Sequence, residues 1–156
     1  MKLRKGFTLV ELLIVIVIIG ILAAAMLLSS GSATASAEAS NIVSDLRSMK
    51  AAALMFFADS MDDTGLTAAI TADGVTLLQP YMDNPSKFGN NAYDFVVYST
   101  SGATEWWVSY SLTIGNKTVA VGEKLANRAS SVGIYNTTLV TSPFVKGNGV
   151  AYMIAR

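Results

Sequence analysis

Carboxylates carry most of the chemistry open to this sequence, because its 156 residues include neither histidine nor cysteine. Zinc sites built on those ligands, thiol catalysis, Ser-His-Asp triads and disulfide bonds are therefore excluded. One carboxylate stands apart from the others, since Glu11 is the only charged residue between Phe7 and Ala37. Its surroundings decide what this carboxylate can do.

Glu11 lies in an apolar run that spans residues 7–28 (FTLVELLIVIVIIGILAAAMLL). As a helix, this run would be about 33 Å long, enough to cross a bilayer core of about 30 Å. Three basic residues precede it: Lys2, Arg4 and Lys5. By the positive-inside rule, they predict a cytoplasmic N-terminal end.

A secretory signal peptide is the alternative reading of this segment. Residues 33–35 (ATA) and 35–37 (ASA) both have the small-x-small form of a signal-peptidase site. The apolar part of a signal peptide usually runs only about 7–15 residues, however, so the longer run favours a retained helix.

The free-energy cost of placing Glu11 in a membrane also helps to distinguish a retained helix from a signal peptide. A carboxylate inside a spanning helix costs on the order of 3 kcal/mol on insertion scales, and a simple anchor has no use for it. One interpretation is that Glu11 sits near the membrane edge and draws in water. The other is that it meets a cation inside the membrane during assembly, and an acid in such a segment favours this functional interpretation.

Residues 5–14 (KGFTLVELLI) follow a short basic leader. They resemble the processing site of type IV prepilins and of the pseudopilins of type II secretion. The resemblance implies that a prepilin peptidase cuts between Gly6 and Phe7 and methylates the new amine of Phe7. It also implies that Glu11 aligns each subunit with its neighbour in a helical filament.

Cleavage there would place an ammonium group on Phe7, four residues before Glu11. Neighbouring subunits that stack with an axial offset would satisfy both charges. A buried pair of this kind is weak evidence for stability, but it suits a device that sets register.

Helical periodicity returns beyond the apolar run. Apolar residues recur at spacings of four, three, four and three: Ile42, Leu46, Met49, Ala53 and Phe56. Polar residues, Asp45 among them, stand between them, which predicts an amphipathic helix that packs against a sheet. A continuous helix from Phe7 to about Ser60 would be roughly 80 Å long.

Alternating residues predict an antiparallel sheet after this helix. Residues 106–114 alternate with period two, and residues 93–100 precede them across a short turn, which suits a hairpin. Further elements are expected as follows: strands at 117–121, 135–141 and 150–154, and a short helix at 123–131. The predicted fold class is α+β, a long N-terminal helix with an antiparallel sheet head, which is pilin-like.

An acidic cluster near the end of the long helix is the one candidate metal site. Asp59, Asp62 and Asp63 supply the oxygen ligands that calcium prefers, although their spacing matches no EF-hand loop. A solvated helix end is the alternative. No other cofactor is predicted.

Three further features of the sequence concern surface contacts, nucleic-acid binding and catalysis. Trp107 falls on the polar face of its strand, where it either contacts another subunit or is covered by a neighbouring loop.

Residues 95–156 carry five bases and two acids, and this positive charge could contact DNA. No run of adjacent basic residues supports DNA binding, however. Contact with the acidic residues 38–94 of a neighbouring subunit is at least as good an explanation of the charge. Asp94 and Glu105 are the acid pair considered for catalysis, and nothing in the sequence brings them together, so no enzyme is predicted.

The expected organisation is a leader at 1–6, a membrane-spanning polymerisation helix at 7–28, an amphipathic continuation at 29–60 and a globular head at 61–156. The predicted function is a structural subunit of a type IV pilus or pseudopilus. The implied partners are copies of the same chain, a prepilin peptidase and an inner-membrane assembly machinery. The implied location is the bacterial inner membrane and then a periplasmic or cell-surface filament. The alternative is a secreted or membrane-anchored binding domain with an ordinary signal or anchor.

Overall fold

The computed structural model describes residues 6–60, 74–100, 103–136 and 142–156. Its dominant element is α1, a single helix of 52 residues from Leu9 to Ser60. The predicted continuous helix is therefore confirmed, and it passes through Gly31 without a break. The chain divides into two compact units, Met1–Thr34 and Ala35–Arg156.

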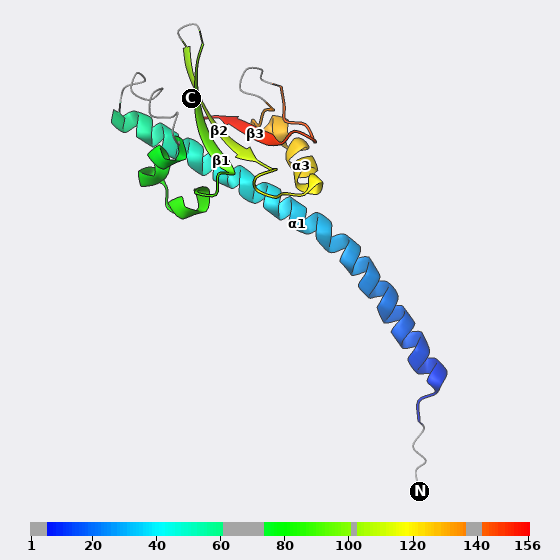
Figure 1. Ribbon diagram of the computed structural model, residues 1–156. Helices are drawn as coiled ribbons and strands as arrows, with labels where there is room; N and C mark the ends of the chain where they lie inside the picture. The colour runs from blue at the N-terminus through cyan, green and yellow to red at the C-terminus, as the bar shows by residue number, and fades with distance from the viewer. Residues whose placement is uncertain (1–5, 61–73, 101–102, 137–141) are drawn as a thin grey trace. The chain divides into compact units, whose positions relative to one another are not determined.

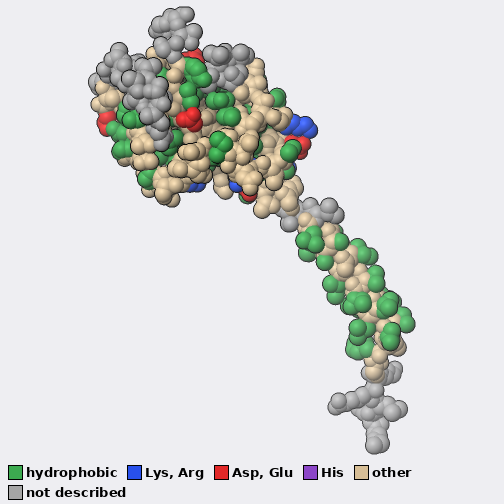
Figure 2. All heavy atoms as spheres, viewed as in Figure 1, with side chains coloured by type: hydrophobic (Ala, Val, Ile, Leu, Met, Phe, Trp, Pro, Cys, Tyr) green, Lys and Arg blue, Asp and Glu red, His purple; other side chains and the backbone are tan. Residues whose placement is uncertain are grey.

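The first unit holds the apolar part of α1. Every described side chain from Leu9 to Leu27 is exposed within the chain, for example Leu9 at 82% and Ile14 at 51%. Hydrophobic side chains cover this stretch of the helix in Figure 2. By length and composition, α1 is the one helix among the described residues that could cross a membrane.

The second unit is built around a three-stranded antiparallel sheet, drawn beside α1 in Figure 1. The strands are β1 (Tyr93–Thr100), β2 (Ala103–Ser111) and β3 (Val150–Ile154), in the order β1-β2-β3. The register sets Tyr93 opposite Tyr110, and Trp107 opposite Ile154. The α+β, pilin-like fold class is confirmed.

The second half of α1 supplies one wall of the core. Leu46, Met49 and Ala53 are fully buried, as the spacing of apolar residues predicted. They pack with sheet residues of the inner face, among them Phe95 and Trp106. The Trp106 ring meets the rings of Phe57 and Phe95 edge-on, with centroids 5.4 and 5.7 Å apart.

Short helices connect the outer elements of the second unit. They are η1 (Gln79–Tyr81), η2 (Pro85–Phe88), α3 (Val119–Ala126) and α4 (Ala129–Val132). The strand predicted at 117–121 is wrong, because α3 begins at Val119 and buries Val121 and Leu125 at helical spacing. The short apolar run was too brief to distinguish a strand from a helix. The helix expected at 123–131 is instead divided between α3 and α4.

The alternation predicted for 106–114 also stops early. β2 ends at Ser111, and the amide of Gly115 donates to the Ser111 carbonyl in a turn. Ile114 is therefore 60% exposed instead of joining the core. Of the strand predicted at 135–141, Tyr135 forms isolated bridges to Pro143 and Tyr152, whereas 137–141 lie outside the described residues.

The core makes a direct prediction for Leu46. We expect Leu46→Ala to lower the free energy of unfolding of the head by about 2–5 kcal/mol, because it leaves a cavity between α1 and the sheet. Ser44→Ala, on the exposed side of the same helical turn, should change it by less than about 0.5 kcal/mol. Denaturant unfolding in detergent, followed by tryptophan fluorescence, measures both variants. Equal effects would contradict this packing.

Candidate functional site

The start of α1 is closed by a reciprocal pair of side chains. Thr8 precedes the first helical residue, and its hydroxyl oxygen accepts a hydrogen bond from the amide of Glu11 at 3.3 Å. In return, Oε2 of Glu11 accepts from the amide and the hydroxyl of Thr8, both at 2.8 Å. This is a capping box, which satisfies amide groups that a helix leaves without partners at its N-terminus.

The capping box gives Glu11 a role within its own chain. Its carboxylate lies in the first turn of α1, where the helix dipole favours negative charge. Part of the cost of placing this acid in an apolar segment is therefore offset locally. Thr8 was not predicted as the partner of Glu11, although Thr8 and Glu11 have the Thr-x-x-Glu spacing of a capping box.

Only one of the two carboxylate oxygens takes part in the cap. Within the described residues, Oε1 of Glu11 has no hydrogen-bond partner, and Phe7, immediately before Thr8, is 89% exposed. A carboxylate accepts hydrogen bonds at both oxygens. Glu11 can thus hold its cap and accept from a second group together.

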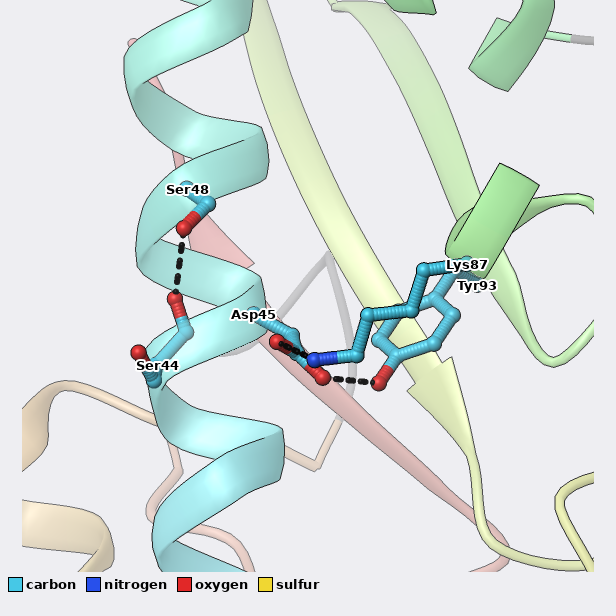
Figure 3. A network of polar contacts seen from close by, with 5 residues as sticks. All are labelled: Ser44, Asp45, Ser48, Lys87 and Tyr93. Carbon is cyan, nitrogen blue, oxygen red and sulfur yellow. Dashed lines mark hydrogen bonds and ion pairs between the residues drawn. The ribbon is translucent and has the colours of Figure 1, made fainter. Parts of the chain in front are cut away.

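A second polar cluster lies inside the head, around Asp45 on α1 (Figure 3). Oδ1 accepts from Nζ of Lys87 at 2.5 Å, and Oδ2 accepts from the hydroxyl of Tyr93 at 2.6 Å. Asp45 itself is only 7% exposed. The cluster therefore ties α1 to η2 and to the first residue of β1.

Asp45 corrects the sequence analysis, which placed it among the polar residues between the apolar positions. It lies three residues after Ile42 and four before Met49, which puts it on the buried face of α1. Its burial requires partners, and Lys87 and Tyr93 supply them. The spacing of Asp45 from Ile42 and Met49 could therefore have predicted its burial from the sequence.

A cleft of about 260 Å³ opens beside this cluster. Its charged lining is already paired, because Lys87 binds Asp45 and Lys117 binds Glu38 at 3.3 Å. Lys117, from the basic residues 95–156, therefore pairs with Glu38, from the acidic residues 38–94, inside one chain and not between neighbours. This arrangement leaves the cleft with no spare charge for an ion.

Comparison with known families concerns the first of these sites. Residues 1–27 match the family described as the prokaryotic N-terminal methylation motif. The chain carries the prepilin-type signal of type IV pilins and pseudopilins. No curated protein and no solved structure is similar enough to the chain to count as a match.

The methylation motif supports a precursor of the pilin or pseudopilin kind. It implies processing by a prepilin peptidase and assembly into pili. The motif and the apolar helix together fit membrane anchoring before assembly. Subunits that carry such a signal are in general structural and not enzymes.

The candidate calcium ligands are not assembled by the described residues. Asp62 and Asp63 lie outside them, and Asp59 accepts a hydrogen bond from the Tyr81 hydroxyl at 2.9 Å. The described part of the chain holds no group of three acidic residues placed to bind a metal.

The register also separates the acid pair considered for catalysis. Asp94 faces Ser109 and Glu105 faces Tyr98, four residues further along β1. At about 3.3 Å per residue, this spacing is about 13 Å. The sheet does not bring the two carboxylates together.

Trp107 requires a correction, because it is 1% exposed and offers no surface for a partner. The ring of Tyr135 covers it edge-on, with centroids 5.8 Å apart, and its Nε1 donates to Glu105 at 3.2 Å. Covering by a neighbouring segment, the second alternative of the sequence analysis, is what the structure has. The outer face of the sheet is therefore packed at this position.

The Asp45 cluster predicts a pH dependence that involves Tyr93. Burial, followed by the hydrogen bond to Asp45, raises the pKa of Tyr93 above its ordinary value near 10. The stability contributed by this tyrosine should be complete below pH 10 and lost as the pH rises toward the raised pKa. We expect Tyr93→Phe to lower the free energy of unfolding by about 1–3 kcal/mol at pH 7.

That difference between Tyr93→Phe and the unmodified head should narrow above pH 10. Denaturant unfolding from pH 7 to 11.5 measures it. Tyrosines distant from Tyr93 titrate alike in both proteins, whereas Tyr110, whose ring centre lies 4.7 Å from that of Tyr93, is changed to phenylalanine in both so that only Tyr93 differs. A difference that stays constant across the range would contradict the raised pKa of Tyr93.

Proposed function

We propose that the chain is the precursor of a filament subunit, processed between Gly6 and Phe7 and assembled through α1 into a type IV pilus or pseudopilus. The prokaryotic N-terminal methylation motif over residues 1–27 is the observation that carries this proposal. Hydrolysis of the Gly6–Phe7 bond leaves a carboxylate on Gly6 and an amine on Phe7. Methylation of that amine retains a group that is protonated at neutral pH.

The geometry at the start of α1 supports this use of Glu11. The cap engages Oε2, so Oε1 is left to accept from the Phe7 ammonium of a neighbouring subunit. Within its own chain, the cap fixes Glu11 in the first helical turn. A fixed carboxylate defines one axial offset between neighbours better than a mobile one does.

The exposed apolar side chains of α1 supply the driving contacts. In the membrane they face lipid, and in the filament they pack against the same helix of other subunits. Because α1 satisfies its own backbone hydrogen bonds, it can pass from one environment to the other without unfolding. The subunit would lie in the bacterial inner membrane first, where an assembly machinery extracts it, and then in a periplasmic or cell-surface filament.

The alternative, a secreted or anchored binding domain, is disfavoured by the position of the candidate signal-peptidase sites. Residues 33–37 lie inside α1, and Ala35 is 4% exposed in the core of the head. Cleavage after Ala35 or Ala37 would remove part of that core. Retention of the whole helix fits the packing better.

The test compares substitutions that separate the two roles of Glu11, capping α1 and supplying a negative charge for assembly. We expect Glu11→Ala to be inserted and processed but to lower filament yield about tenfold or more, because a neighbour's ammonium is left unpaired. Glu11→Gln can keep the capping box and lacks the charge, so it should show a similar loss. Thr8→Val, which removes the capping hydroxyl, should lose less.

Filaments are counted by electron microscopy and by shearing yield, with membrane fractionation as the control for insertion. Normal yield from Glu11→Ala would contradict the role in assembly. Normal yield from Glu11→Gln alone would assign Glu11 to capping instead of register.

A further inference from the structure

Most charges of the head already have partners within it. Three ion pairs lie within the described residues, Lys87–Asp45, Lys117–Glu38 and Lys146–Glu123. Arg128 donates to the Ser40 hydroxyl, and the Arg156 guanidinium lies 3.6 Å from the centre of the Phe57 ring. Among the described residues of the head, few charges remain without such a contact.

Two of the remaining cations, Arg47 and Lys50, are neighbours on α1. They lie three residues apart on one helix face, and no ion pair or hydrogen bond engages either side chain within the described part of the chain. They border a cleft of about 360 Å³ whose other walls include Val132, Tyr135 and Ile154. We call this the Arg47–Lys50 site.

Among the described residues, no acidic side chain lines the Arg47–Lys50 site. Its other lining residues are apolar or aromatic, apart from Gly133 in a left-handed turn after α4. Two cations beside such a surface attract an anionic group, and the planar guanidinium of Arg47 suits a carboxylate. The site therefore fits an acidic side chain.

Asp83 is the exposed acid that lacks a partner among the described residues of the head. It lies between η1 and η2, at a cleft of about 300 Å³ that is also lined by Ser48, Ala51 and Met55 of α1. At 100° per residue, those three positions lie about 100° around the helix from Arg47 and Lys50. The acid and the two cations thus occupy different sides of one subunit.

We propose that the Arg47–Lys50 site of one subunit binds Asp83 of the next subunit in the filament. This inference rests on the proposed function, since it requires a second copy of the chain. Opposite charges on different sides of a protomer form a heterologous contact, which repeats without closing and so generates a filament. Each interior subunit makes the contact twice, once with each side.

An exposed ion pair contributes little stability alone, but complementary charge fixes register and disfavours wrong alignments. The contact would therefore orient the heads while the apolar helices supply most of the association. Lys124 on α3 also lacks an ion pair among the described residues, and it lines none of these clefts. It provides a matched control.

The first experiment reverses the charges in the full chain, in cells that carry the assembly machinery. We expect the double variant Arg47→Glu, Lys50→Glu and the single variant Asp83→Lys each to lower filament yield by about fivefold or more. Combining all three substitutions should restore most of the yield. Lys124→Glu should assemble normally.

Wild-type yield from the double variant would overturn the proposal. So would a loss that Asp83→Lys neither reproduces nor rescues, because a different acidic partner would then occupy the Arg47–Lys50 site. Insertion and processing are checked for every variant, so that a folding failure is not counted as an assembly failure.

The second experiment uses the absence of cysteine from the sequence. Filaments of a chain with both Val132→Cys and Asn84→Cys, which line the two clefts and leave Arg47, Lys50 and Asp83 in place, are treated with a short bis-maleimide reagent. A ladder of covalent multimers is expected from this chain, and monomers are expected from either single variant. Dimers from Val132→Cys alone would indicate a two-fold contact and contradict the proposal.

The two proposals fail in different ways. If the unmodified chain forms no filament, the proposed function fails and cross-linking is not reached. If filaments form but the doubly substituted chain gives no ladder, the Asp83 contact is wrong and the filament function stands.

Discussion

One helix that must serve two environments is the constraint on which the rest of this molecule depends. The first part of α1 exposes its apolar side chains on every side, while the second part supplies Leu46 and Met49 to the core of the head. The exposed part needs lipid or other protein, because the hydrophobic effect disfavours its contact with water. At the start of this helix, Glu11 and Thr8 satisfy two of the amides that would otherwise lack partners, those of Thr8 and Glu11.

The head compensates for the lack of any disulfide by packing around α1. Its small sheet is covered on the inner face by the helix and, at Trp107, on the outer face by Tyr135. The buried carboxylate of Asp45 joins the helix to β1 and η2 through two short hydrogen bonds. A buried charge with both partners in place is costly to disrupt, so this cluster holds the helix in one register against the sheet.

Periodicity predicted the elements that repeat over many residues, namely α1 and, as far as Ser111, the strand β2. It failed where a short segment depended on its neighbours. Residues 117–121 looked like a strand because their apolar run is short. Trp107 was left between surface contact and covering by a loop, because Ser109, Ser111 and Thr113 share its face of the predicted strand. Asp45 was assigned to solvent by residue type, although its spacing from Ile42 placed it on the core face. Tyr135 covers Trp107, and Lys87 and Tyr93 pair with Asp45. These partners are distant in sequence, so no local pattern reveals them. The start of α1 was different, because Gly6, Phe7 and Glu11 lie within one short motif.

The intact mass and N-terminal sequence of the mature protein, purified from its native host, test the processing of this chain most directly. We predict a chain that begins at Phe7 and carries one methyl group on its terminal nitrogen, as the prokaryotic N-terminal methylation motif implies. A mature chain that begins near Ser36 or Glu38 would contradict it. In that case the apolar segment would be an ordinary signal peptide, and neither Glu11 nor the first part of α1 would reach a filament.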